Sequence, residues 1–220
     1  MAIRALTQSI CSNCKQVIEL YVRNTDLYIC PQCIQVYTKQ NLDLQFSAKY
    51  IRRPDTMSSI QIGTEGSMDG RAFRVIGCLV LVFEDKFIHL WRIVDAEGVS
   101  DWLIQFPNYV LDAGFTEANQ AYFKDLEMKI GMSGHQIPGL NISYTLSCIT
   151  KYKYTYALGE VNMIMKENDK GLLYQFHSHK GYQFLLFVNT IDSMTALAAR
   201  NIEFSELALT RTKTLGLWSI

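Results

Sequence analysis

Two short cysteine motifs near the start of the chain decide the expected fold: Cys11-Ser12-Asn13-Cys14 and Cys30-Pro31-Gln32-Cys33. Fifteen residues separate Cys14 from Cys30, which falls within the spacing of a four-cysteine zinc ribbon. Two thiolates three positions apart on a tight turn can bind one face of a tetrahedral ion, and a second pair can bind the opposite face. We therefore expect Cys11, Cys14, Cys30 and Cys33 to bind one Zn²⁺ ion. Because four protein ligands leave no open coordination position, this ion should be structural.

Redox chemistry and disulfide formation are the other common uses of paired cysteines. A thioredoxin-like redox site usually has a single C-x-x-C motif near a βαβ pattern, and the chain shows no such pattern. Disulfides are typical of secreted chains, whereas Met1–Thr7 has neither the apolar core nor the cleavage site of a signal peptide. A reducing cytoplasm is the expected location. Cys78 and Cys148 lie in apolar stretches and are predicted to be small buried residues in strands.

The composition is that of a globular protein with no overall charge. Its 220 residues are enough for one large or two modest cores beside a small metal unit, and no apolar run is long enough to span a membrane. Residues 1–53 carry seven Lys or Arg against three acids, which gives +4, and the remainder gives −4. This bias is smaller than the basic surface of a nucleic-acid-binding protein.

The rest of the chain has the pattern of many short antiparallel strands. From Met57 onward, runs of Val, Ile, Phe, Tyr and Trp alternate with Gly, Asn and Asp. The expected strands span residues 71–83, 87–94, 101–106, 109–111, 141–156, 159–166, 171–177 and 183–188. Residues 194–200 fit a short helix or a strand equally well, and 202–210 are expected to form a strand. The predicted fold class is therefore mainly β, a zinc ribbon followed by two small, mostly antiparallel β-modules that pack as half-barrels, with few short helices.

Three domains are expected: 1–53 for the ribbon and linker, 54–120 for the first β-module and 121–220 for the second. Pro54 marks the linker, because proline disfavours helix in the residue before it and ends regular pairing. The two modules look related. Residues 60–66 are similar to 128–134 at an offset of 68, and 102–106 to 172–176 at an offset of 70. These matches predict an internal duplication.

Several segments outside the cysteines resemble a bacterial family in which a four-cysteine zinc ribbon precedes a domain of unknown function, the DUF4178-type family. They are residues 60–66, Asp69–Gly77, the tryptophan strand Asp101–Phe106 and the step Leu158-Gly159-Glu160-Val161. The resemblance covers most of residues 11–190. Two positions depart from the family pattern: Val161-Asn162 replaces its usual Leu-Pro, and Tyr109 stands where the family has a second tryptophan.

The resemblance implies a protein partner and no catalytic residue. The family has no established activity, so no active site carries over. Its members are often encoded near PspA-like coiled-coil proteins of membrane-stress systems and near enzymes similar to those of polyamine synthesis. This implies a cytoplasmic protein that associates with a PspA-like partner, which would bring it to the membrane surface.

Two further groups of residues allow both a functional and a structural interpretation. His177 and His179 share a strand face and could bind a metal ion, but no further ligand is evident, and a polar turn explains them as well. His89 and His135 stand alone. Tyr152, Tyr154 and Tyr156 are predicted to share one strand face, with Lys151 and Lys153 on the other. The tyrosines could stack on single-stranded nucleic acid, or could form the buried face of a strand.

The acids offer a weak basis for catalysis. Asp69, Asp95, Glu97 and Asp101 are the best candidates, yet Asp69-Gly70 and Glu97-Gly98 are typical of turns between strands. The chain has no phosphate-binding glycine loop, no nucleophile elbow and no Cys–His arrangement. We therefore expect a non-catalytic adaptor or scaffold that acts through protein contacts in a membrane-stress or defence assembly. A nucleic-acid-binding zinc ribbon is the first alternative and an enzyme the second.

Overall fold

The structure is a computed structural model that describes residues 3–23, 25, 27–40, 43–49, 58–83, 86–115, 130–131, 135–136, 142–161, 170–189 and 194–213. Within these residues the chain forms fifteen strands and one 3₁₀ turn. No helix in the described part is long and apolar enough to cross a membrane.

The first five strands form the ribbon. They are β1 (Thr7–Ile10), β2 (Val17–Leu20), β3 (Leu27–Ile29), β4 (Gln35–Gln40) and β5 (Asp43–Lys49). The cysteine motifs lie in the turns between β1 and β2 and between β3 and β4. The other ten strands belong to the two predicted modules. They are β6 (Glu65–Met68), β7 (Arg71–Phe83), β8 (Lys86–Asp95), β9 (Ser100–Gln105), β10 (Val110–Phe115), β11 (His135–Gln136), β12 (Ser143–Val161), β13 (Lys170–His177), β14 (Tyr182–Asn189) and β15 (Met194–Ile202).

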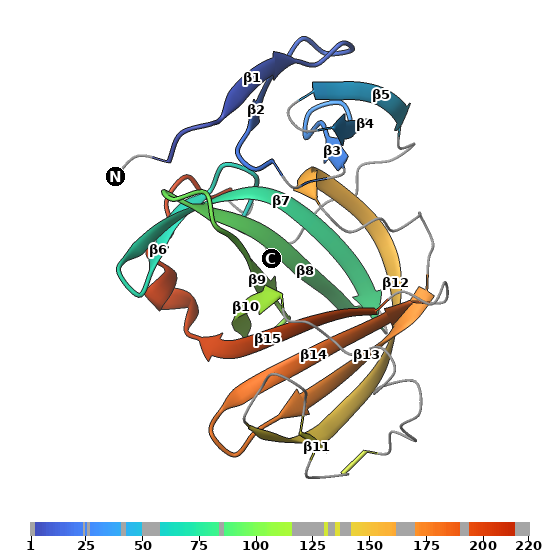
Figure 1. Cartoon of the computed structure of the whole chain (residues 1–220), viewed down its shortest axis with the longest axis vertical. Helices are drawn as coiled ribbons and strands as arrows, with labels where there is room; N and C mark the ends of the chain where they lie inside the picture. The colour runs from blue at the N-terminus through green and yellow to red at the C-terminus, as the bar shows by residue number, and fades with distance from the viewer. Residues whose placement is uncertain are drawn as a thin grey trace, which may run out of the picture.

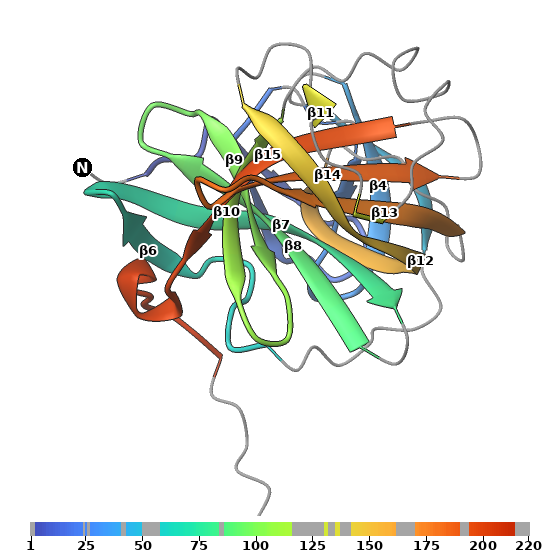
Figure 2. The same cartoon turned by 90° about the horizontal axis from the view of Figure 1, so that it is seen from below.

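Eight strands close into a barrel to which each predicted module contributes one half. Strands β7 to β10 pair in sequence order, and so do β12 to β15 (Figures 1 and 2). Antiparallel ladders between β7 and β12 and between β10 and β15 join the halves. The predicted fold class, mainly β with antiparallel half-barrels behind an N-terminal cysteine cluster, is confirmed. Strand β3 also pairs with β12, so the ribbon continues the barrel sheet.

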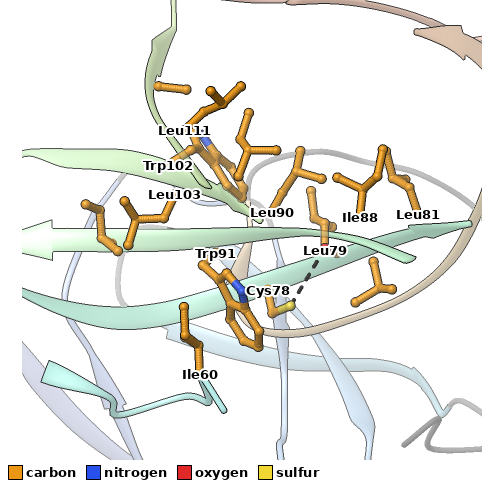
Figure 3. Packing of buried hydrophobic residues seen from close by; sticks show 14 of the residues in the cluster. Ile60, Cys78, Leu79, Leu81, Ile88, Leu90, Trp91, Trp102, Leu103 and Leu111 are labelled. Atoms are coloured by element: carbon orange, nitrogen blue, oxygen red, sulfur yellow. Dashed lines mark hydrogen bonds between the residues drawn. The ribbon is translucent and has the colours of Figure 1, made fainter. Parts of the chain in front are cut away.

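The main core covers both faces of the sheet at β7 and β8. In Figure 3, Leu79 and Leu90 lie on one side of these strands with Trp102, whereas Cys78 and Trp91 lie on the other side. All five residues are nearly inaccessible to solvent and belong to one cluster. A strand that is buried on both faces loses the alternation of polar and apolar residues. This explains the nearly continuous apolar run of β7.

The end of the chain differs from two sequence-based predictions. The alternative of a helix over 194–200 is wrong, because this segment is strand β15, which pairs with β10 and β14 on its two sides. Hydrogen bonding to two neighbours outweighs the helix preference of its alanine-rich sequence. The strand predicted over 202–210 is also wrong beyond Ile202: the 3₁₀ turn η1 (Phe204–Leu207) follows, and only Thr210 forms an isolated bridge, to Glu65.

The two strands expected around Ala157 form one long strand, β12, up to Val161, and residues 162–169 lie outside the described part. The similarity of 102–106 to 172–176 does not correspond to equivalent strands. Residues 102–105 lie in β9, the third barrel strand of the first half, whereas 172–176 lie in β13, the second barrel strand of its half. The strand equivalent to β9 by order along the chain is β14.

Candidate metal centre and its attachment to the barrel

The four predicted cysteines form a compact sulfur cluster. All four Sγ atoms lie within 4.8 Å of one another. The Sγ atoms of Cys11 and Cys33 are 3.5 Å apart, and those of Cys14 and Cys30 are 3.6 Å apart. A tetrahedral ion with metal–sulfur bonds of about 2.3 Å would separate its sulfurs by roughly 3.8 Å. The cluster therefore has the size and the donor set to hold one metal ion.

The two cysteine turns share one backbone geometry. In the first turn, the N–H of Lys15 donates to the carbonyl of Cys11 (3.0 Å) and the N–H of Cys11 donates to Gln16 (2.9 Å). In the second turn, the N–H groups of Ile34 and Cys30 make the same bonds, at 2.8 and 2.9 Å. Lys15 and Ile34 both have positive φ, at 61° and 56°. The local bonds of each turn thus hold its two cysteines toward the same point.

Backbone N–H groups point at the sulfurs and favour their thiolate form. Burial would raise the pKa of Cys11, but hydrogen bonds from the N–H groups of Cys14 and Asn13 and from the Tyr37 hydroxyl lower it to about 6. For Cys30 burial dominates and raises the pKa to about 12, against hydrogen bonds from the N–H groups of Cys33 and Gln32. Because thiolates are the metal ligands, binding must displace a proton from the buried sulfur.

Tyr37 was not singled out from the sequence, yet it connects the two cysteine turns. From β4 in the second half of the ribbon, its hydroxyl donates to Sγ of Cys11 at 3.1 Å. The same oxygen accepts the N–H of Ser12 at 2.9 Å. Its ring belongs to the small ribbon core beside Tyr28, with the ring centroids 6.5 Å apart. A single tyrosine gives no sequence signal for such a role.

A buried carboxylate fastens the ribbon to the barrel. Glu160 on β12 is only 1% exposed. Its carboxylate accepts hydrogen bonds from the backbone N–H groups of Tyr21 and Val22, the latter at 3.4 Å, and from the hydroxyl of Thr25 at 3.3 Å. Arg74 on β7 adds an ion pair to Glu19 (3.4 Å) and lies over the ring of Tyr21. The available signal was the Gly159-Glu160 step.

Two glycines allow close backbone approach at this junction. Gly77 and Gly159 are partners in the β7–β12 ladder. A Cβ on Gly77 would lie 2.0 Å from the carbonyl oxygen of Glu160, and a Cβ on Gly159 would lie 2.1 Å from that of Ile76. Gly159 also has a φ of +69°. Any side chain would clash with the facing backbone at either position, and glycine also adopts the positive φ of Gly159 freely. The two glycines therefore let β12 contact β7 and β3 at the same point.

The tyrosine stripe is buried, and its three rings do not share one face. Tyr152, Tyr154 and Tyr156 are each at most 3% exposed, while the neighbouring Lys151 and Lys153 are exposed. A β-bulge separates Tyr154, opposite Leu81, from Tyr156, opposite Val80. Because neighbouring residues of β7 point to opposite faces, so do these two tyrosines. The predicted shared face is therefore wrong, and none of the three rings is available for stacking on nucleic acid.

The candidate acids occupy turns and strand ends. Asp69 lies in the β6–β7 turn and forms an ion pair with Arg200, which also binds Asp112. Asp95 accepts the N–H groups of Glu97 and Val99, both at 2.9 Å, as expected for a turn. Burial, and next the charge of Asp112, raises the pKa of Asp101. None of the four predicted acids lines the pocket at the barrel mouth or the pocket between ribbon and barrel.

The histidines do not join a metal cluster. His177 ends β13 and His179 lies in the following turn, both exposed. His135 lies in β11, and its side chain is outside the described part. His89 is buried, stacked on Trp91 at 5.5 Å, and its Nε2 has no hydrogen-bond partner among the described residues. Over the described ranges, the four cysteines are the only group of three or more metal-binding side chains.

The remaining two cysteines differ in burial. Cys78 is fully buried, as expected, whereas Cys148 is only partly buried, with its Sγ 3.1 Å from the hydroxyl oxygen of Thr150. All six cysteines lie within the described residues and none forms a disulfide.

No protein-family model matches this chain, and no curated protein or solved structure matches it either. The resemblance to the DUF4178-type family therefore stays a prediction from the residues quoted above. The function has to be inferred from the geometry of the chain itself.

Proposed function

We propose that the protein is a non-catalytic adaptor or scaffold that acts through protein–protein contacts, and that its cysteine cluster holds one structural Zn²⁺ ion. The observation that carries the adaptor proposal is an apolar surface on the β1–β2 hairpin. We call it the hairpin face and define it by Leu6, Ile10 and Val17. These side chains are 50%, 65% and 51% exposed.

The hairpin face follows from strand alternation. Leu6 and Ile10 lie on one side of the first strand segment, and Val17 is the cross-strand partner of Ile10. The opposite side carries Ile18 and Leu20, which are buried in the small core around the cysteines. Strands β1 and β2 pair with no other strand in the described part. The hairpin is thus covered on one face only.

The size of the hairpin face suits a protein partner. Single exposed apolar residues are common on protein surfaces, but a group of them marks an interaction surface more often. Ile10 and Val17 are cross-strand neighbours, and the polar pair of Gln8 and Glu19 lies between them and Leu6. Burial of one Leu, Ile or Val side chain contributes about 1.5–3 kcal/mol. Because the three side chains are only about half exposed, burial of the remaining surface would supply a part of the roughly 8 kcal/mol of a micromolar complex. A metal-stabilised ribbon would hold them in place without chemistry of its own.

Zinc is the ion that the donor set favours. Four thiolates in a tetrahedral arrangement are typical of structural zinc, and iron is the main competitor. Elemental analysis of freshly purified protein should find one zinc per chain. A coloured protein that contains iron, or one without metal, would contradict this part of the proposal.

The resemblance supplies a proposal for the partner and the location. We propose a cytoplasmic protein whose partner is PspA-like and brings it to the membrane surface in a stress or defence assembly. The absence of disulfides among the six cysteines agrees with a reducing compartment. The hairpin face is the surface through which such a partner would bind.

An internal duplication is a further proposal that strand order supports. Each half runs from a glycine turn through a short strand into a long one, β6 and β7 in the first half, β11 and β12 in the second. Gly63 and Gly131 have φ values of +88° and +87°. Their N–H groups donate to Val75 and Leu146, each on the long strand of its own half. The first barrel strands of the two halves, β7 and β12, pair with each other, and so do the last, β10 and β15. This is the arrangement of a twofold-symmetric pair of modules.

The adaptor proposal is tested by capture from the native host with the full chain. We expect the wild type to recover one protein in stoichiometric amount and Ile10→Glu to lose it, because a buried carboxylate opposes docking. Val99→Glu is the matched control, since Val99 is also 50% exposed but lies in the β8–β9 turn. Recovery of no stoichiometric protein by the wild type would contradict the proposal, and so would equal recovery by Ile10→Glu.

A further inference from the structure

One end of the barrel opens into a pocket of about 690 Å³. Its wall combines the β9–β10 turn with the end of β13, the start of β14 and the chain just after β15. An eight-stranded barrel has room either for packed side chains or for one small ligand. In this barrel the packed core fills one part, and the pocket, which we call the mouth pocket, occupies the other.

The barrel interior changes from apolar to polar at the mouth pocket. Along β13, Leu173 is buried in the main core, and Gln175 lies two residues further on the same face. The same change occurs on β14, between Leu185 and Gln183, and on β15, between Ala199 and Asn201.

Three carboxamide side chains from three adjacent strands therefore share one inner wall. Two of them are already paired, since Nε2 of Gln183 donates to Oδ1 of Asn201 at 3.0 Å.

An aromatic pair forms another part of the pocket lining. The rings of Phe106 and Tyr109 stack with centroids 4.5 Å apart and an interplanar angle of 13°. Phe106 is buried, whereas Tyr109 is 39% exposed, so one ring of the stack remains open to solvent. Burial raises the pKa of Tyr109, and the nearby side chain of Gln175 acts against this rise. The tyrosine hydroxyl therefore lies next to the carboxamide wall.

The charge of the mouth pocket excludes strongly ionic ligands. None of its described lining residues is Lys, Arg or Asp, and apart from Tyr109 the ionisable ones are His177 and Glu203. A phosphate or carboxylate ligand would lack a fixed cation to bind. A cationic ligand would meet a single carboxylate.

We propose that the mouth pocket binds a neutral carbohydrate, with one pyranose ring on the face of Tyr109. A carboxamide offers both donors and an acceptor, and so does a sugar hydroxyl, which is a donor and an acceptor at once. The C–H face of a pyranose is apolar and packs on an aromatic ring, while its hydroxyl edge reaches the wall of Gln175, Gln183 and Asn201. The volume lies within the usual range for small-ligand sites. The site shares no residue with the hairpin face, so it stands independently of the adaptor proposal.

The test is titration of the full-length protein, followed by amide NMR shifts. The probes are D-glucose, D-galactose, D-mannose and N-acetyl-D-glucosamine, with adenine as a neutral heterocycle and glucose 6-phosphate as a charged sugar. We expect at least one neutral sugar to produce saturable shifts at residues 106–109, 175–177 and 201–204. Glucose 6-phosphate should bind no better than glucose.

Variants connect the shifts to the carboxamide wall. Asn201→Ala should weaken binding of the sugar about fivefold, the effect expected for one lost hydrogen bond. Tyr109→Phe, which keeps the ring, tests the link to Gln175 and should weaken binding by a smaller factor. Gln8→Ala, on an exposed residue of β1, is the control and should bind like the wild type. The proposal is overturned if no neutral sugar gives saturable shifts, if adenine binds and the sugars do not, or if Asn201→Ala binds unchanged.

Discussion

The ribbon and the barrel are stabilised in different ways. The core around the cysteines contains only six buried residues, and two of them, Cys11 and Cys30, are predicted ligands. The barrel core extends over both faces of β7 and β8 and draws residues from both halves of the closed sheet. A unit as small as the ribbon buries too little apolar surface to fold alone, whereas the barrel buries enough. We therefore expect the stability of the ribbon to depend on metal binding and on its attachment to the barrel. The stability of the barrel should depend on core packing.

Metal removal should give the largest effect and should separate the two regions. Strong chelation, or Cys30→Ser, is expected to unfold the ribbon while the barrel stays folded, because structural zinc contributes about 10–16 kcal/mol in small zinc units. Hydrogen exchange should then show lost protection in β1 to β4 and retained protection in β8 and β9. Cys148→Ser, at a cysteine outside the cluster, is the control. If the ribbon amides kept their protection from hydrogen exchange after metal removal, the expected dependence of the ribbon on metal would be contradicted.

Removal of the carboxylate at Glu160 should detach the ribbon without unfolding the barrel. Glu160→Gln places an amide opposite two N–H groups and a hydroxyl, and we expect a cost of about 3–5 kcal/mol to local stability. The amides of Tyr21 and Val22 should exchange much faster with solvent. Glu97→Gln, in an exposed turn, should leave both amides unchanged. Unchanged exchange in Glu160→Gln would show that the carboxylate does not hold the ribbon on the barrel.

Acid should destabilise the barrel through His89. Burial lowers the pKa of this histidine from 6.5 to about 4. The folded form therefore stays neutral while the unfolded form takes up a proton, so stability is lost as pH falls from 6.5 to 4. This difference in pKa between the folded and unfolded forms corresponds to a loss of about 3 kcal/mol in the free energy of unfolding.

Chemical denaturation of the barrel, followed by tryptophan fluorescence between pH 7 and pH 4, measures this loss. The variant His89→Leu should lack that part of the pH dependence, whereas His179→Gln, at an exposed turn residue, should keep it. Equal pH dependence in all three proteins would contradict the assignment to His89.

The smallest effect compares the two cysteine turns. Lys15 and Ile34 have similar positive φ values, which are unfavourable for both residues and more so for the β-branched isoleucine. Lys15→Gly should stabilise the ribbon by about 1 kcal/mol, because Lys15 is exposed and glycine adopts this conformation freely. Ile34→Gly should gain less, since Ile34 packs against the barrel core. The rate of zinc release to a chelator measures both changes, and a more stable ribbon should release zinc more slowly. Slower release from Ile34→Gly than from Lys15→Gly would contradict the reasoning.

The candidate metal site was more predictable than the fold around it. The spacing of the cysteines was sufficient to predict that all four sulfurs lie together. Within each C-x-x-C pair, hydrogen bonds inside six residues position the two cysteines. The turn geometry itself was hidden, since Lys15 and Ile34 stand where glycine is the usual residue for positive φ. Tyr37 and Glu160 were missed because their partners lie far away in the sequence, up to 139 residues in the case of Tyr21 and Glu160.

Errors in the barrel came from pairing between distant segments. The tyrosines of β12 alternate regularly in sequence, but the bulge between Tyr154 and Tyr156 turns one ring to the opposite face. Residues 194–200 have no local signal that decides between helix and strand, and they form a strand because β10 and β14 both supply hydrogen-bond partners.

By itself, the sequence determined the sulfur cluster and the β-rich character of the chain, because three-residue spacing and the alternation of side chains are local properties. Only the tertiary structure decided which strands close the barrel, where the ribbon is tethered and which carboxamides meet at the mouth pocket. These features depend on pairing between segments that are distant in sequence. The register of one ladder is set by all the others, and no local pattern contains that information.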